Sequence, residues 1–271
     1  MLGAGEPALH APSSEPELRA SLLVIGHRGN SAHAPENTLE SFRQAIALGV
    51  DGLEFDVRLS ADGQLVVIHD PTVERTTNGT GVVSGLTLEQ LRAFDAGYNF
   101  GAPRYPYRGR GVTIPTVVEA LDLTAPLPLV IEIKALEAAE PLLALIQARH
   151  EEERVTIGSF VAGALLPFRK ASMRTSASFD EVRALLAPAV CGLRRKSVPF
   201  NVLSIPPRYR RVPLPVRALA RCLAPAGTPL HVWTVNDPAE ALWLWKHGAN
   251  AILTDDPATI LEARHQARLS A

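Results

Sequence analysis

Short apolar runs alternate with longer amphipathic stretches along most of this chain of 271 residues. A short run that is apolar throughout predicts a buried strand, whereas apolar residues spaced three or four positions apart predict a helix. Strands are expected at 22–26, 52–57, 64–69, 128–133, 154–159, 174–178, 201–205, 229–235 and 251–254. Helices are expected at 38–48, 87–94, 116–123, 138–149, 162–170, 180–187, 215–223, 238–247 and 257–267.

This alternation is typical of a parallel α/β fold. The run at 64–69 fits an antiparallel return, because Ser60-Ala61-Asp62-Gly63 before it has the composition of a hairpin turn. Charged residues follow at least four strands, and the mouth of a barrel brings more strand ends together than an open doubly wound sheet. The sequence therefore predicts an α/β fold, a modified TIM (β/α)8 barrel with a small insertion after the strand ending at His69.

The chain is expected to form one domain behind a short leader. Residues 1–20 mix Gly, Pro, Ser and Glu and predict a flexible leader, and residues 21–271 predict a single barrel domain. The insertion, at about 70–113, is rich in Gly, Thr, Asn, Tyr and Arg and lies on the side of the charged strand ends. The first helix is expected to have Asn37 as its N-cap.

Composition excludes some classes of partner. A formal net charge of −1 gives no whole-protein field that would attract nucleic acid or an anionic membrane. Neither a secretory signal at 1–20 nor a run of about 18 apolar residues is present, so no membrane span and a cytoplasmic location are expected. Cys191 and Cys222 lack metal-type spacing, so free thiols are expected.

Three carboxylates at strand ends are the candidate metal ligands. Residues i and i+2 of a strand face the same way, so Glu54 points with Asp56, and Glu132 with Lys134. Oxygen ligands of this kind suit Mg²⁺, Mn²⁺ or Ca²⁺ rather than zinc. The alternative is that the carboxylates belong to an exposed strand face.

Two histidines and two cations complete the candidate site. His27 and His69 each end a strand, and imidazole titrates in the range that suits general acid or base work on a phosphodiester. Arg28 offers a planar fork to phosphate oxygens and Lys134 a compact charge. Both could also be salt-bridge partners of Glu54 or Glu132.

Other motifs point less sharply to a function. Trp233 could pack against an apolar part of a ligand or belong to the core. The basic stretches Arg194-Arg195-Lys196 and Arg208, Arg210, Arg211 could touch phosphate, although a solvated loop is the better interpretation. A nucleotide-binding loop and a serine nucleophile elbow are both missing.

Together these motifs resemble the glycerophosphodiester phosphodiesterase family from about residue 23 to residue 257. The resemblance is carried, in this order, by Gly26-His27-Arg28-Gly29, Ala34-Pro35-Glu36-Asn37-Thr38-Leu39, Gly52-Leu53-Glu54-Phe55-Asp56-Val57, His69-Asp70-Pro71, Ile114-Pro115-Thr116, Glu132-Ile133-Lys134, Trp233-Thr234-Val235-Asn236 and Thr254-Asp255-Asp256-Pro257.

The resemblance implies a modified TIM barrel and a divalent cation held by Glu54, Asp56 and Glu132. It also implies His27 and His69 as acid and base, Arg28 and Lys134 on the phosphate, and Glu36 close to the site. The implied reaction is metal-dependent hydrolysis of glycerophosphodiesters, deacylated phospholipids, to glycerol 3-phosphate and an alcohol.

Several questions stay open at this stage. One alternative is lysophospholipase D-type cleavage of lysophospholipids, and another is a catalytically silent barrel that binds a phosphorylated ligand. The attacking group could be water or the glycerol 2-hydroxyl acting through a cyclic phosphate. The headgroup, the preferred cation among Mg²⁺, Ca²⁺ and Mn²⁺, and the oligomeric state are not determined by the sequence.

Overall fold

The computed structural model describes residues 22–160 and 162–269, and the predicted leader lies outside these ranges. The strands are β1 (Leu23–His27), β2 (Gly52–Leu59), β3 (Leu65–Val67), β4 (Leu129–Ile133), β5 (Val155–Gly158), β6 (Leu203–Ile205), β7 (Arg208–Tyr209), β8 (Val212–Pro213), β9 (Leu230–Val232) and β10 (Ala251–Thr254). The α-helices are α2 (Leu39–Leu48), α3 (Leu88–Arg92), α4 (Val117–Thr124), α5 (Ala139–Ala148), α6 (Ala162–Lys170), α7 (Phe179–Val190), α8 (Val216–Leu223), α9 (Pro238–Lys246) and α10 (Pro257–Leu269). Short 3-10 helices lie at Val83–Gly85, Leu136–Ala138 and Ala224–Ala226.

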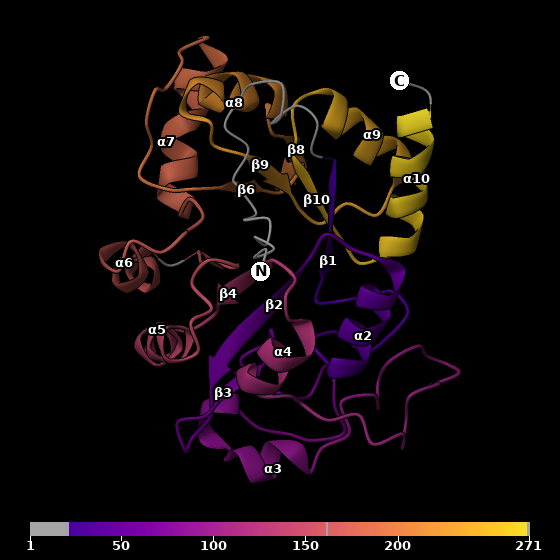
Figure 1. Cartoon of the computed structure of the whole chain (residues 1–271). Helices are drawn as coiled ribbons and strands as arrows, with labels where there is room; N and C mark the ends of the chain where they lie inside the picture. The colour runs from indigo at the N-terminus through magenta and orange to yellow at the C-terminus, as the bar shows by residue number, and fades with distance from the viewer. Residues whose placement is uncertain (1–21, 161, 270–271) are drawn as a thin grey trace, which may run out of the picture.

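Among the described residues, seven parallel strands form a curled sheet, with helices along its outer side (Figure 1). Neighbours in the sheet follow the order β5-β4-β2-β1-β10-β9-β6. The strand predicted at 174–178 is reduced to two parallel bridges, Ile157 with Thr175 and Ser176 with Val202. These bridges join the two ends of the sheet, so strand order around the ring follows chain order, as in a TIM barrel.

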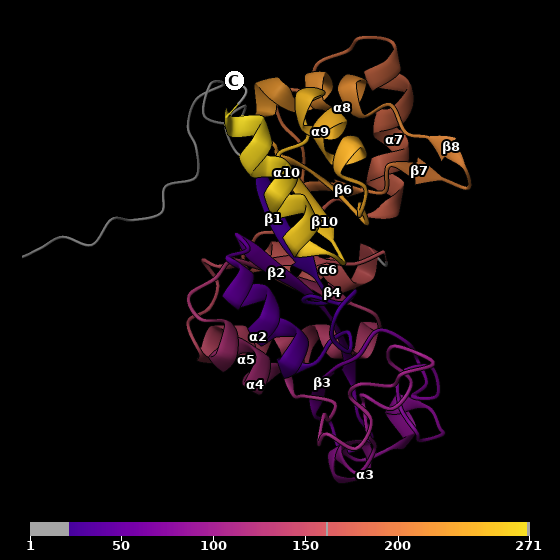
Figure 2. The same cartoon turned by 90° about the vertical axis from the view of Figure 1, so that its right-hand side faces the viewer.

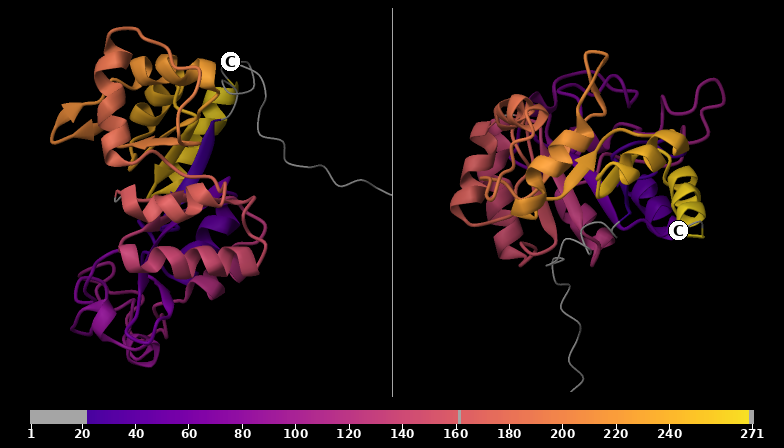
Figure 3. Two further views of the ribbon diagram at one scale, coloured as in Figure 1. Left: turned by 90° about the vertical axis from the view of Figure 1, so that its left-hand side faces the viewer. Right: turned by 90° about the horizontal axis from the view of Figure 1, so that it is seen from above.

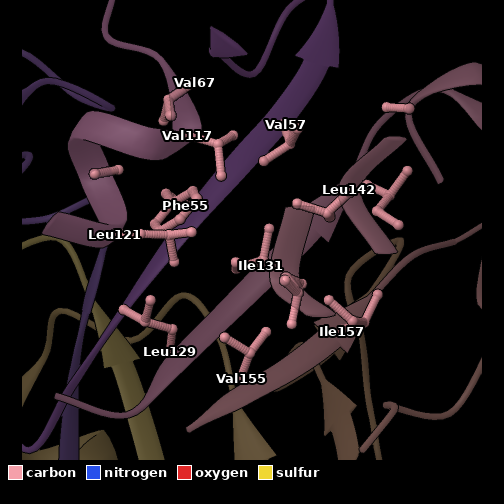
Figure 4. Packing of buried hydrophobic residues seen from close by; sticks show 14 of the residues in the cluster. Phe55, Val57, Val67, Val117, Leu121, Leu129, Ile131, Leu142, Val155 and Ile157 are labelled. Atoms are coloured by element: carbon pink, nitrogen blue, oxygen red, sulfur yellow. The ribbon is translucent and has the colours of Figure 1, made fainter. Parts of the chain in front are cut away.

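The core lies mainly between the sheet and the helices. Side chains alternate along each strand, so Leu53, Phe55 and Val57 of β2 point outward while Glu54 and Asp56 point inward. Leu129, Ile131 and Ile133 of β4 also pack outward in the same cluster, against residues of α4 and α5 (Figure 4). A second cluster joins β6, β9 and β10 to α7, α8, α9 and α10. Packing on the outer face thus leaves the inner positions of β2 and β4 free for polar side chains.

The insertion rises from the strand ends, as expected. β2 extends past its neighbours and β3 returns antiparallel to it, with Val57 opposite Val67. Residues 70–113 then hold one short α-helix, α3, and the 3-10 turn Val83–Gly85. A small separate cluster around Val73, Val83 and Leu91 gives this segment its own core. The insertion and the β7–β8 hairpin project from the same side of the molecule (Figures 2 and 3).

The start of α2 differs from the prediction. Its N-cap is Thr38, whose hydroxyl accepts a hydrogen bond from the Ser41 amide, and not Asn37. Asn37 adopts a left-handed conformation with φ of 57° and turns its amide toward β2. Asn37 therefore stands one position before the N-cap and holds Asp56 of β2 in place, although asparagine often caps helices.

Two other expectations can be compared with the structure. Cys191 is exposed and Cys222 buried, and both are free thiols. Within the described ranges, every helix is too short or too polar to cross a bilayer.

Candidate active site

The inner faces of three adjacent strands place the predicted polar residues side by side. β1 pairs with β2 so that His27 stands opposite Glu54, and β2 pairs with β4 so that Asp56 stands opposite Glu132. His27 and Glu132 lie near the carboxyl ends of β1 and β4, and Glu54 and Asp56 stand level with them on the longer β2. TIM barrels build their active sites at this end of the sheet. Strand register alone therefore brings together residues more than 100 positions apart.

The three carboxylates form a compact oxygen cluster. Glu54, Asp56 and Glu132 each offer an oxygen within 4.8 Å of the other two. Lys134 Nζ lies 2.8 Å from Glu132 Oε1 and 3.0 Å from Asp56 Oδ1. The spacing is compatible with oxygens that share one hard divalent cation, and the oxygen-only ligand set fits Mg²⁺, Ca²⁺ or Mn²⁺. The predicted ligands are thus in one place.

Burial separates the two central carboxyls electrostatically. Glu54 is 3% exposed and Asp56 is fully buried. Burial, reinforced by the Asp56 charge, raises the pKa of Glu54 to about 8. Burial acts on Asp56 in the same sense, but Lys134 and Arg28 outweigh it and lower the pKa of Asp56. Without a cation, the pKa values of the two carboxyls therefore move in opposite directions, and Asp56 is the one that the neighbouring cations hold in its charged form.

His27 is fixed by a carboxylate from the last strand of the barrel. Its Nδ1 lies 2.6 Å from Asp255 Oδ1, directly after β10, and its Nε2 lies 3.9 Å from Glu54 Oε2. Burial alone would lower the pKa of His27, but Glu54 and Asp255 outweigh this effect and raise the pKa. Ser31 donates a further hydrogen bond to Asp255. Nε2 is therefore the nitrogen that faces the carboxylate cluster.

His69, two residues after β3, is held in the same way by an aspartate. Its Nδ1 lies 2.6 Å from Asp70 Oδ1. Arg75 of the insertion donates to Asp70 Oδ2 at 2.5 Å and to both oxygens of Glu36, at 2.6 and 2.8 Å. The hydrogen bond from Arg75, despite some burial, lowers the pKa of Asp70 to about 2. Arg75 thus ties the insertion to the loop that follows β1.

Arg28 begins a sharp turn at the end of β1. Its φ is 55° and that of Gly29 is 90°, so two consecutive residues are left-handed. The Arg28 amide donates to Glu54 Oε2 at 3.0 Å, and Nη1 donates to Glu36 Oε1 at 2.7 Å. Nε lies 3.2 Å from Asp56 Oδ2. Lys134 thus pairs with Glu132, as the salt-bridge alternative expected, and also with Asp56, whereas the side chain of Arg28 pairs with Glu36 and Asp56 in place of Glu54 or Glu132.

Asn37 positions Asp56. Its Nδ2 donates to Asp56 Oδ2 at 2.8 Å, and its Oδ1 accepts from the Asp56 amide at 3.2 Å. A neutral amide that satisfies one carboxylate oxygen leaves Oδ1 facing Lys134 and the cluster.

The remaining predicted residues lie around this centre. Trp233 follows β9, is half-buried against the Ile25 and Leu253 cluster, and meets Phe160 edge-to-face at 5.7 Å. Arg194, Arg195 and Lys196 are exposed in the loop after α7. Arg208 belongs to β7, and Arg210 and Arg211 form the tip of the β7–β8 hairpin.

Sequence reasoning gave no role to Asp255, Asp70 or Arg75, and it gave Asn37 only the role of a helix cap. Two of them left a signal, because Asp70 directly follows His69 and Asp255 directly follows a strand. Arg75 left none, since its importance depends on how the insertion folds back onto Glu36. Eight site residues were predicted, and the structure brings all of them except Trp233 into one hydrogen-bonded and ion-paired network, which His69 joins through Asp70, Arg75 and Glu36.

Known proteins are similar to this chain in sequence and in fold. The model of the glycerophosphoryl diester phosphodiesterase family matches residues 27–259. A glycerophosphodiester phosphodiesterase from Caldanaerobacter subterraneus is 35% identical over 246 residues, which cover 88% of this chain and 96% of the relative.

Two solved structures agree with this match. A phosphodiesterase from Oleispira antarctica, in complex with the product sn-glycerol 3-phosphate, superposes with a TM-score of 0.74 at 27% identity, over 90% of this chain and 97% of the other. A glycerophosphoryl diester phosphodiesterase domain from Mycobacterium tuberculosis, at 22% identity, shares the fold with a TM-score of 0.79, over 91% and 99% of the two chains. The family model and the relative each match most of this chain, and the predicted site residues lie together on the inner face of its barrel. The chain is therefore an enzyme that belongs to the glycerophosphoryl diester phosphodiesterase family.

Proposed function

We propose that this enzyme hydrolyses glycerophosphodiesters to glycerol 3-phosphate and an alcohol, with one divalent cation held by Glu54, Asp56 and Glu132. The observation that carries the proposal is the triangle of carboxylate oxygens, all within 4.8 Å, flanked by two histidines whose Nδ1 atoms are each fixed by an aspartate. The product bound to the Oleispira antarctica relative supports glycerol 3-phosphate as the phosphate-bearing product.

The positively charged side chains of Arg28 and Lys134 bind and orient the phosphodiester. Arg28 and Lys134 lie against the carboxylate cluster and keep their positive charges, because neighbouring carboxylates more than offset burial and raise the pKa of both groups. They stabilise the negative charge that grows on the phosphoryl oxygens as the new bond forms. A cation bound by the three carboxylates would supply further charge stabilisation at the phosphate.

The two histidines move protons. With Nδ1 of each ring held on an aspartate, Nε2 is the atom free to exchange a proton with substrate. One imidazole takes the proton of the attacking hydroxyl and the other gives a proton to the departing oxygen. Both routes named earlier, attack by water and attack by the glycerol 2-hydroxyl, use this pair in the same way.

The test is release of glycerol 3-phosphate from glycerophosphocholine and glycerophosphoethanolamine, with Mg²⁺, Mn²⁺, Ca²⁺ or a chelator. We expect release that a chelator abolishes and one of the cations restores. Full activity in chelator would contradict the metal assignment, and no release under any condition would contradict the substrate class.

The ligand set has a readout of its own. Glu132→Gln and Glu54→Gln should each weaken cation binding measured by titration calorimetry, by about 10-fold or more, because a charged oxygen ligand is lost. Glu36→Gln is a matched control, because it also removes one carboxylate charge close to the site but Glu36 pairs with Arg28 and Arg75 and is not one of the three proposed ligands. Equal loss in the control would indicate a general electrostatic effect.

Lysophospholipids remain a second substrate class to test. Phe160 is 54% exposed where it meets Trp233 near the mouth, which gives an acyl chain an apolar surface to contact. Choline release from lysophosphatidylcholine, compared with glycerophosphocholine in one assay, ranks the two classes.

A further inference from the structure

The net charge of −1 conceals a strong separation of charge along the chain. Residues 182–236 contain no Asp or Glu but nine basic residues: Arg183, Arg194, Arg195, Lys196, Arg208, Arg210, Arg211, Arg217 and Arg221. The rest of the chain carries 18 basic and 28 acidic residues. The segment 182–236, which holds α8, the loop after α7 and the β7–β8 hairpin, is therefore cationic in an otherwise acidic protein, whereas Asp180 and Glu181 in the first turn of α7 lie just outside it.

The β7–β8 hairpin presents part of this charge at its tip. Arg208 pairs with Pro213 and Tyr209 with Val212, which leaves Arg210 and Arg211 as a two-residue turn. Both have positive φ, 47° and 70°, as in a type I′ turn. Asn and Gly adopt this conformation with least strain, so a pair of arginines there is a costly choice. The chain thus holds two cations at the outermost point of the hairpin.

Exposed apolar side chains lie on the same hairpin and at its base. Val212 is 64% exposed, Tyr209 44% and Phe179, at the start of α7, 41%. The rings of Tyr209 and Phe179 are 5.9 Å apart, and the Arg210 guanidinium lies 5.5 Å from the Tyr209 ring centre. We call these five residues (Phe179, Tyr209, Arg210, Arg211 and Val212) the hairpin patch.

The patch is anchored at its base but has no partner at its tip. Arg208 forms an ion pair with Glu240 of α9 at 2.7 Å, and Tyr209 leans on Phe179. Among the residues that the structure describes, no carboxylate pairs with Arg210 or Arg211. The hairpin stands on the same side of the molecule as the insertion, the side of the strand ends (Figure 3). The hairpin therefore projects beside the mouth of the barrel.

We propose that the hairpin patch docks the enzyme on an anionic lipid surface, with the mouth of the barrel facing the bilayer. Arg210 and Arg211 carry positive charges that complement anionic headgroups. Tyr209 has an apolar ring and a polar hydroxyl, a combination that suits the boundary between the headgroups and the hydrocarbon of a bilayer. The exposed side chains of Val212 and Phe179 can bury apolar surface in the hydrocarbon of a bilayer, whereas nucleic acid offers no such hydrocarbon. The occupant that best matches the patch is thus a bilayer rich in anionic phospholipid.

The first test is flotation of the full chain with vesicles of phosphatidylcholine, and with vesicles in which part of it is replaced by phosphatidylglycerol. We expect binding to the anionic vesicles only, weakened by added salt. Each arginine near such a surface contributes about fivefold in affinity, so Arg210→Gln with Arg211→Gln should lower binding by about 25-fold. Val212→Asn should lower the binding that remains at high salt.

The matched control is Arg194→Gln with Arg195→Gln. These arginines are also exposed, lie in the same basic segment, and follow the far end of α7, about 18 Å along the helix from Phe179. The control should keep at least half of the vesicle affinity, and all variants should keep the thermal midpoint of the parent. Because flotation requires no turnover, its result is independent of the proposed hydrolysis.

Four outcomes would overturn the proposal. They are absence of vesicle binding, equal binding to neutral and anionic vesicles, equal loss in the control variant, and tighter binding to a duplex DNA fragment than to the anionic vesicles. A dimer in sedimentation velocity that the patch variants dissociate would instead assign the surface to a second copy of this chain.

Discussion

At the scale of single residues, the site depends on two histidine–aspartate pairs of similar geometry. His27 meets Asp255 and His69 meets Asp70, each at 2.6 Å through Nδ1. The two aspartates differ in how they are held. Asp70 is tied to the insertion through Arg75, whereas Asp255 accepts from Ser31 and Asn236 within the barrel. One histidine is therefore positioned by the barrel and the other by the insertion.

Asp255→Asn should lower kcat by about 10²-fold with little change in KM, because the imidazole loses the carboxylate that orients it. Loss of that negative charge also lowers the pKa of His27, so the limb of the kcat profile that reports His27 should move to lower pH. The measurement is kcat against pH in saturating cation.

Asp256→Asn on the same loop is the control for that change. Asp256 pairs with the half-exposed His33 at 3.2 Å and accepts from Thr259. If the two substitutions had the same effect, the role of Asp255 would be general loop stability and not the positioning of His27.

At the scale of elements, the turn from β1 into α2 fixes the geometry of Arg28. A Cβ on Gly29 would lie 2.3 Å from Ser41 Oγ and 2.7 Å from the Ser41 backbone, while Ser41 Oγ donates to the Arg28 carbonyl. The first turn of α2 thus packs directly on the turn that aims the arginine. Gly49 at the other end of α2 is also left-handed, but its Cβ would meet open space.

These two glycines allow conformational strain to be separated from steric clash. Gly49→Ala should lower the free energy of unfolding by about 1 to 2 kcal/mol, the cost of a left-handed alanine. Gly29→Ala adds overpacking of about 1 to 3 kcal/mol and should cost about 2 to 5 kcal/mol in all, with loss of activity. Urea unfolding of both variants measures the difference. Equal destabilisation would mean that Ser41 and the start of α2 move aside to accommodate the added methyl group.

The sequence predicted elements better than their ends and partners. The strand–helix alternation, the antiparallel return at β3 and the inward side of Glu54 and Asp56 all follow from local periodicity. Two details did not: the cap at Thr38, because Asn37 is drawn to Asp56 by a tertiary contact, and the reduced strand at 174–178, whose pairing depends on both neighbours. The β7–β8 hairpin was missed because prolines and arginines are poor strand formers.

Site residues followed the same division. Those on strand ends, such as His27 and Glu132, could be identified because each carries a local signal. Arg75 could not, because its partners Glu36 and Asp70 approach it only after the insertion folds. The roles of these residues in catalysis stay predictions for the experiments above.

At the scale of the whole molecule, the carboxylate cluster links stability to pH and to cation. In the metal-free protein the pKa of Glu54 is raised from 4.5 to about 8. The folded state therefore keeps a proton that the unfolded chain releases, and the free energy of unfolding falls as pH rises across this window. His27 acts in the same direction, because its pKa is raised from 6.5 and its contribution is lost as pH rises through the raised value.

The chelated protein should therefore lose thermal stability as pH rises from about 5 to about 8. Added Mg²⁺ should restore it, and more strongly at higher pH because the cation replaces the proton on Glu54. Scanning calorimetry with and without cation measures both trends. Glu54→Gln, which cannot titrate at this position, should show a weaker pH trend in chelator, and a metal-free parent that gained stability toward pH 8 would contradict the account.

The pairing of β1 with β10 has a consequence for the timing of synthesis. His27 and Asp255 are 228 residues apart, so at ribosomal rates about 10 to 50 seconds separate the appearance of the two halves of this contact. Until β10 emerges, β1 has one open edge, and an unpaired edge invites pairing with other chains. A nascent chain therefore carries both an incomplete catalytic pair and an aggregation risk, and both end together when the last strand closes the ring.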